Sequence, residues 1–199
     1  PRAPVVRRQP AREVQQGAHR RADARCMVVA RATDATGNVY AIGGVMPMQL
    51  LKYNNAGLLQ WTYNTPYDTS NVWLGTFATD NLGNSYVTAG STAAIQKINT
   101  SGGIVWNNPN PGGLFSSDEF WNISFNCDQS KLVLGGTTGF ATNLLAAIFE
   151  IDVATGNVLN TQTVSSGNAF SFPPTIQEVR SITANPNGKY FWLTQDTLG

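Results

Sequence analysis

Short runs of apolar residues alternate with polar turns along most of this 199-residue chain. The runs are rich in Val, Ile, Tyr and Thr, and the turns between them contain Asp, Asn and Gly. Runs bounded by such turns predict β-strands joined by hairpins. Three glycines that each close such a run, Gly44, Gly90 and Gly136, stand 46 residues apart. The hydrophobic pattern therefore predicts a repeated all-β unit.

The first two units repeat each other closely. Residues 32–44 and 78–90 share the pattern Asp-x-x-Gly-Asn-x-Tyr, and residues 51–61 and 96–106 share a Lys, a Gly and a final Trp. The positions that recur along the chain are Asp34, Asp80 and Asp128, then Gly37 and Gly83, then Gly57, Gly102 and Gly156, and finally Trp61 and Trp106.

The later units are less regular. The third contains an insertion around residues 137–145, and Asn160 stands where the earlier units have Trp. The fourth begins near Ile182. A bulky residue lies seven positions before each recurring aspartate, on the strand predicted to be innermost in its unit, and these residues are Met27, Trp73 and Trp121.

Two turns divide each unit into four predicted strands. In Asp-x-x-Gly and Asn-x-x-Gly turns the Asx side chain bonds the following backbone and glycine supplies a positive φ. Four-stranded units of about 46 residues are typical of β-propeller blades. We therefore expect an all-β propeller fold of about three complete blades and a partial fourth, with units near residues 26–72, 73–119, 120–177 and 178–199.

Propeller rings close with roughly four to eight blades. Three blades and part of a fourth would leave an open sheet edge, which natural proteins normally cover. We expect the chain to be a fragment of a larger propeller, with the remaining blades in cis. The alternative is ring closure in trans by a second chain.

Charge separates the amino-terminal part of the chain from the remainder. Residues 1–31 hold eight of the 13 basic residues and only two acids, whereas residues 32–199 hold five basic and ten acidic residues. Residues 1–25 contain no aromatic residue and too little apolar surface to fold alone, so we expect an unfolded or artefactual extension. An arginine-rich arm that binds polyanions is the alternative, although no aromatic residues are present to stack on nucleic-acid bases.

The recurring motifs resemble two groups of propeller repeat. Residues 80–106, with Asp-x-x-Gly-Asn-x-Tyr-Val, Lys-Ile-Asn-Thr-x-Gly and a terminal Trp, resemble the SBBP-type repeat of secreted bacterial β-propellers. The Gly-x-x-x-Trp pattern and residues 152–156 are similar to the quinoprotein-like (PQQ-type) repeat, in which Trp docks one blade on the next. Asn160 departs from that pattern. The resemblance implies a fold, whereas one fold hosts many activities.

The polar, turn-rich composition of residues 32–199 favours a secreted or cell-surface protein. No signal peptide is visible, and no apolar run approaches the length of a membrane span. Cys26 and Cys127 are interpreted as small buried residues, with a disulfide between them as the alternative.

Candidate catalytic groups are few. His19 is the only histidine and lies in the basic extension, so the sequence offers no histidine-based triad or metal cluster in the repeats. Asp68, Asp118 and Glu119 fall in predicted connections, where carboxylates are usually solvated. The turn aspartates lack the spacing of a calcium loop. We therefore predict no catalytic residue, metal or cofactor in this segment, and we lean towards a protein that is not an enzyme.

Tryptophans that recur at one repeat position are expected to pack between blades rather than to bind sugar. Recognition is instead expected in the three longest connections, residues 62–72, 107–120 and 161–177. Their candidate binding residues are Tyr63, Tyr67, Phe115, Asp118, Glu119, Phe170 and Phe172. The sequence thus predicts a non-enzymatic module that binds protein or glycan at a cell surface. The alternative is a piece of a propeller enzyme, either a quinoprotein-like oxidoreductase or a glycosidase or lyase, whose catalytic residues lie elsewhere.

Overall fold

A computed structural model describes seven stretches of the chain, which are residues 28–43, 48–65, 76–88, 94–109, 119–140, 143–164 and 175–196. Every regular element in these stretches is a β-strand. Gly44, Gly90, Met27, Trp73 and the basic extension lie outside them. Within the described residues, no helix could cross a membrane.

The strands form the predicted antiparallel units. The first blade consists of β1 (Val28–Thr33), β2 (Val39–Gly43), β3 (Gln49–Tyr53) and β4 (Leu59–Asn64). The second consists of β5 (Phe77–Thr79), β6 (Ser85–Thr88), β7 (Ile95–Ile98) and β8 (Ile104–Asn108). The third consists of β9 (Glu119–Phe125), β10 (Lys131–Phe140), β11 (Asn143–Asp152) and β12 (Val158–Thr163). A further hairpin, β13 (Thr175–Ala184) and β14 (Tyr190–Asp196), begins a fourth.

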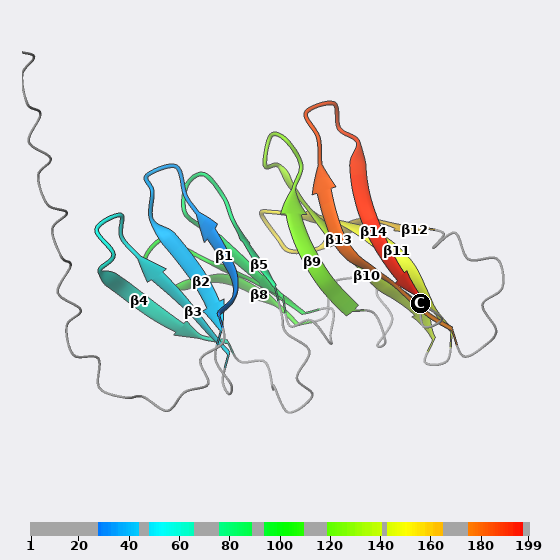
Figure 1. Ribbon diagram of the computed structural model, residues 1–199, viewed down its shortest axis with the longest axis horizontal. Helices are drawn as coiled ribbons and strands as arrows, with labels where there is room; N and C mark the ends of the chain where they lie inside the picture. The colour runs from blue at the N-terminus through cyan, green and yellow to red at the C-terminus, as the bar shows by residue number, and fades with distance from the viewer. Residues whose placement is uncertain are drawn as a thin grey trace, which may run out of the picture.

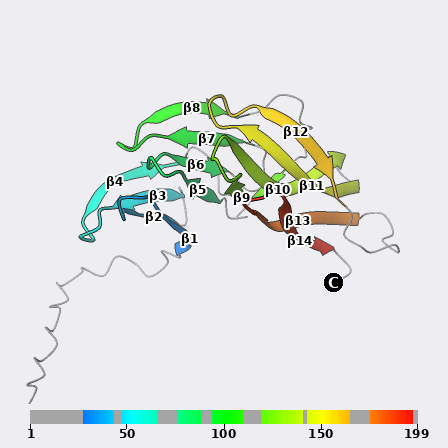
Figure 2. The ribbon, with the colours of Figure 1, turned by 90° about the horizontal axis from the view of Figure 1, so that it is seen from above.

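The blades stand side by side in an arc. Figure 2 shows β1, β5 and β9 on the concave side of this arc and β4, β8 and β12 on its convex side. In Figure 1 the tight hairpin turns, such as β1–β2 and β9–β10, lie along the upper edge. We call this edge the turn face. The opposite edge, where β4, β8 and β12 end and β5, β9 and β13 begin, is the connection face. This arrangement confirms the predicted β-propeller fold.

The insertion in the third unit lengthens its central hairpin. β10 and β11 each contain ten residues, and their pairing continues from Lys131 with Asp152 to Phe140 with Asn143. The longer β11 also pairs in parallel with the start of β13, through Asn143 with Thr175 and Leu144 with Ile176. The third blade and the fourth hairpin are therefore joined by main-chain hydrogen bonds as well as by side chains.

The core lies between blades. One apolar cluster, which includes Tyr40, Ile42 and Leu50, fills the space between the first and second blades. A second, which includes Phe120 and Phe149 with ring centroids 5.0 Å apart, separates the second and third. A third joins the third blade to the fourth hairpin and includes Val133 and Val179. Each apolar cluster is built from the facing sides of two neighbouring blades, so the inner strands contribute most of the buried residues.

The β9–β10 turn of the third blade corrects the predicted equivalence of Asp128 with Asp34 and Asp80. Asn126, not Asp128, occupies the position of Asp34 and Asp80, because the Lys131 amide donates to Asn126 Oδ1 at 2.9 Å. Gln129 takes the place of the turn glycine with a φ of 57°. Asp128 remains in the turn, where its carboxylate accepts from the Ser130 amide at 2.9 Å.

Candidate functional site

Each blade is fixed by an Asx turn at its first hairpin. Asp34 Oδ1 accepts from the Thr36 and Asn38 amides at 3.0 Å, and Oδ2 accepts from the Tyr40 hydroxyl at 3.0 Å. Burial alone would raise the pKa of Asp34, but hydrogen bonds from the Asn38 side chain, the Thr36 hydroxyl, the Asn38 amide and the Tyr40 hydroxyl hold it well below its ordinary value. The Tyr40 hydroxyl also lies 3.1 Å from the Gly83 carbonyl of the second blade. The turn carboxylate therefore helps to position an inter-blade hydrogen bond.

A lysine and a tryptophan from one blade converge on one carbonyl of the next. Lys52 Nζ and Trp61 Nε1 lie 3.1 and 2.9 Å from the Thr100 carbonyl oxygen. In the next pair of blades, Lys97 Nζ and Trp106 Nε1 both lie 3.3 Å from the Val153 carbonyl oxygen. Thr100 and Val153 each follow the Asx residue of a second hairpin turn. We call this arrangement the Lys–Trp contact.

The glycine of the accepting turn provides a flat surface for the indole. A side chain at Gly102 would come within 3.0 Å of the Trp61 ring, and one at Gly156 within 2.5 Å of the Trp106 ring. Both glycines also have positive φ, of 86° and 76°. Glycine is therefore required here for its backbone conformation and for the approach of the tryptophan.

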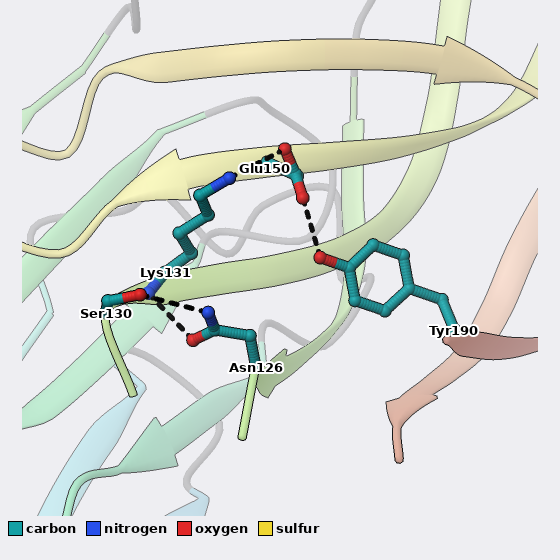
Figure 3. Close-up of polar contacts among 5 residues, drawn as sticks. All are labelled: Asn126, Ser130, Lys131, Glu150 and Tyr190. Atoms are coloured by element: carbon teal, nitrogen blue, oxygen red, sulfur yellow. Dashed lines mark hydrogen bonds and ion pairs between the residues drawn. The ribbon is translucent and has the colours of Figure 1, made fainter. Parts of the chain in front are cut away.

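The third blade contacts the fourth hairpin differently. Glu150 pairs with Asn160 across β11 and β12, as Lys52 pairs with Trp61 across β3 and β4. Glu150 accepts from Lys131 Nζ at 3.2 Å and from the Tyr190 hydroxyl at 2.6 Å (Figure 3). At this interface, the Glu150 carboxylate with Lys131 and Tyr190 thus takes the place of the Lys–Trp contact. We call these three residues the Glu150 cluster.

This cluster changes two pKa values in opposite directions. The hydrogen bond from Tyr190 and the nearby Lys131 ammonium lower the pKa of Glu150 despite its burial. Burial and then the Glu150 carboxylate raise the pKa of Tyr190 to about 12. Both shifts follow from a carboxylate that accepts hydrogen bonds in a partly dry interface.

Three further contacts join the third blade to the fourth hairpin. Asn122 Oδ1 accepts from the Ile182 amide at 3.1 Å, and the Arg180 guanidinium lies 4.3 Å from the centroid of the Trp121 ring. Cys127 Sγ lies 2.6 Å from the Asn185 carbonyl oxygen. The structure corrects the sequence interpretation of Cys127 as buried, because this free thiol is exposed.

The candidate binding residues divide between strands and connections. Tyr63 lies in β4, where its hydroxyl donates to Gln96 Oε1 of the second blade at 3.0 Å. Glu119 begins β9 and pairs with Thr137. Tyr67, Phe115, Asp118, Phe170 and Phe172 lie outside the described residues, as does Asp68. The three connections are shorter than predicted, because β4, β8 and β12 continue to Asn64, Asn108 and Thr163.

The partners across the blade interfaces were not visible in the sequence. Only the repeated nine-residue spacing of Lys52 with Trp61 and Lys97 with Trp106 pointed to a paired role. The Glu150–Tyr190 bond had no comparable signal, because it occurs once. Among the described residues, no group of three or more His, Cys, Asp or Glu side chains could hold a metal ion.

Solved structures with similar folds support the propeller architecture. A streptogramin B lyase aligns with a TM-score of 0.55 and 18% identity over 83% of this chain and 47% of its own. BamB from Moraxella catarrhalis aligns with a TM-score of 0.54 and 12% identity over 83% of this chain and 46% of its own. Quinohemoprotein alcohol dehydrogenase from Comamonas testosteroni aligns with a TM-score of 0.50 and 19% identity over 64% of this chain and 20% of its own.

These similarities concern the fold alone, because one fold carries many activities at such low identity. The chain spans less than half the length of each of these three proteins. In sequence, it matches no protein-family model and no curated protein.

Proposed function

We propose that this chain is a non-enzymatic binding or scaffold module of an exported or cell-surface β-propeller protein, with SBBP-type repeats. The connection face would recognise a protein or a glycan. One observation carries this proposal: turns on the turn face bond to the neighbouring blade, whereas the connection face is where the long connections leave the strands.

The turn face is used for holding blades together. Its turns accept the Lys–Trp contacts at Thr100 and Val153, and Asn81 donates its amide to Gln129 Oε1 of the third blade at 3.0 Å. At these turns the named polar groups bond to the protein itself. A ligand there would have to compete with contacts that maintain the fold.

At the connection face, main-chain hydrogen bonds hold the strand ends from which the longer connections leave. Where the connections depart, the Thr65 amide donates to the Met48 carbonyl and the Val164 amide to the Ala146 carbonyl, both at 2.9 Å. Loops on a rigid scaffold carry most binding functions. The sequences of the connections contain Tyr67, Phe115 and Phe170, and aromatic rings suit both sugar faces and protein hot spots.

Binding of the labelled chain to a glycan array and to a panel of bacterial surfaces tests the proposal. A triple variant, Tyr67→Ala with Phe115→Ala and Phe170→Ala, should lose at least about tenfold in affinity. Leu82→Ala is the matched control, because Leu82 is an apolar side chain 79% exposed on the turn face. Binding that survives the triple variant, or that Leu82→Ala removes, would contradict a connection-face site, and so would the absence of any binding in both panels.

A propeller enzyme is the second candidate function. It is favoured by the similar folds of an alcohol dehydrogenase and a streptogramin lyase, both enzymes by name. Turnover of an alcohol or a streptogramin by the purified chain would support this candidate over the binding module.

A further inference from the structure

The second-hairpin turns of consecutive blades are equivalent, but they are not equally occupied. The turns at Asn99–Gly102 and Asp152–Gly156 each accept a lysine and a tryptophan from the preceding blade. In the first blade the equivalent turn is Asn54–Gly57, where Asn54 Oδ1 accepts from the Ala56 and Leu58 amides at 3.0 and 2.9 Å, as Asn99 Oδ1 accepts from the Ser101 and Gly103 amides. All three turns have an Asx residue directly before the accepting position and a later glycine with positive φ, and the Asp152–Gly156 turn is one residue longer than the other two.

The first-blade turn has the acceptor features without a donor among the described residues. Gly57 has a φ of 78°, and no described atom lies within 4 Å of the side chain that it lacks. The Asn55 carbonyl, equivalent to those of Thr100 and Val153, accepts no hydrogen bond within the described stretches. The turn therefore has the acceptor geometry of the two Lys–Trp contacts, and no residue of another blade in the described part of the chain donates to it.

The first turn of this blade is open in the same way. A side chain at Gly83 would lie 2.8 Å from the Tyr40 hydroxyl of the preceding blade. The equivalent Gly37 would meet only Asn55 of its own blade, at 3.6 Å. Two neighbouring turns of the first blade thus expose the positions that elsewhere receive Tyr, Lys and Trp.

The far end of the arc presents the complementary surface. Phe191 and Leu193 on β14 occupy the positions of Tyr40 and Ile42 on β2 in the blade repeat. Tyr40 and Ile42 are fully buried against the second blade, whereas Phe191 and Leu193 are 57% and 66% exposed. Both ends of the described arc therefore carry surfaces of the kind that blades bury on each other.

At the strand positions that form the Lys–Trp contact, the described residues offer no free donor for the first-blade turns. Lys52, Trp61, Lys97 and Trp106 are already engaged on the next blade. The third blade has Glu150 and Asn160 at these positions. A second copy of the described residues would present the same engaged side chains, so it is a poor occupant.

We propose that residues 34–38 and 54–58 form a docking surface for a further blade of the same repeat, which presents a Lys and a Trp nine residues apart. The indole lies on Gly57, and its N–H and the ammonium donate to the Asn55 carbonyl. This site is independent of ligand recognition at the connection face, so each can fail without the other.

A hairpin that carries the two donors tests the proposal directly. The probe is a backbone-cyclised peptide with the sequence of residues 95–108, which contains Lys97 and Trp106 and which cyclisation holds as a hairpin. It is titrated into the isotopically labelled 199-residue chain while backbone amide signals are followed by NMR. We expect saturable shifts at Asn54–Leu58 with a dissociation constant of about 1 mM or lower.

Two kinds of variant distinguish docking at this site from non-specific binding of the peptide. A peptide with Trp106→Ala should shift these signals at least about tenfold less at equal concentration. Gly57→Asn in the protein should abolish the response, because Asn tolerates positive φ but covers the indole position. Gly188→Asn is the matched control, since Gly188 has a φ of 72° and equally open surroundings. Absence of shifts at Asn54–Leu58, or shifts that persist with Trp106→Ala or Gly57→Asn, would overturn the proposal.

Discussion

Positive-φ glycines in this protein serve two separable purposes. At Gly188 and Gly57 only the backbone conformation requires glycine, because nothing described lies near the missing side chain. At Gly156 and Gly102 the conformation and the tryptophan contact both require it. Glycines with the same turn pattern in the sequence therefore contribute different amounts to the free energy of unfolding.

Alanine substitution should separate these two purposes. Gly188→Ala is expected to lower the free energy of unfolding by about 1 kcal/mol, which is the cost of a left-handed alanine. Gly156→Ala adds overlap with the Trp106 ring, and we expect a loss of about 2 to 4 kcal/mol. Urea denaturation of both variants measures the difference. Equal losses would show that the indole does not press on Gly156.

The Glu150–Tyr190 bond should make stability depend on pH at both extremes. The folded-state pKa of Glu150 lies below its ordinary 4.5, so its contribution is present above about pH 4.5 and is lost as pH falls through the folded value. The pKa of Tyr190 rises from 10.0 to about 12, so its contribution is present below pH 10 and is lost as pH rises towards 12.

Tyr190→Phe isolates the alkaline part of this dependence. The wild-type chain should exceed the variant in stability below pH 10, and the difference should shrink between pH 10 and 12. Urea midpoints of both proteins across that range measure it, and other tyrosines cancel in the comparison. A constant difference from pH 8 to 12 would contradict the shifted pKa.

At the scale of elements, strand pairing is anchored by cross-strand side chains that also reach the next blade. Lys97 pairs with Trp106 across β7 and β8, and its ammonium lies 5.1 Å from the centroid of the Tyr86 ring. One lysine thus contacts a ring in its own blade and a carbonyl in the next. Its loss should weaken the interface rather than the hairpin.

Lys97→Met keeps the aliphatic stem and removes the charge. We expect a loss of about 1 to 2 kcal/mol, from a hydrogen bond and a cation–π contact. Lys189→Met, at an exposed turn residue of the fourth hairpin, is the control and should change stability by less than about 0.5 kcal/mol. Thermal and urea unfolding measure both, and similar effects of the two substitutions would argue against the contact.

The elements themselves were predictable where turn chemistry is regular. Asp34 and Asp80 with their glycines located the first hairpins of two blades correctly. The third failed by two residues, because Gln129 adopts the left-handed conformation normally given to glycine and Asp128 then matched the pattern instead of Asn126. The inter-blade partners of Trp61 and Trp106 could not be predicted, since a backbone carbonyl acceptor leaves no mark on residue type.

At the scale of the whole molecule, the blades form a chain of nearest-neighbour contacts. Each described blade buries side chains on the adjacent blades through separate apolar clusters. Stability in such repeats is the sum of unit and interface terms. A substitution that weakens one interface should therefore destabilise the two blades that form it and leave the other interfaces unchanged.

Trp61→Ala should weaken the first blade without affecting the third. Removal of the indole from the interface is expected to cost about 3 kcal/mol, which corresponds to faster local opening by about two orders of magnitude. Hydrogen exchange should therefore accelerate at amides of β1–β4 and remain near wild-type rates in β9–β12. Trp192→Ala, at a side chain 47% exposed on β14, is the control and should leave β1–β4 unchanged. Uniform acceleration along the whole chain would instead indicate that the blades unfold as one cooperative unit.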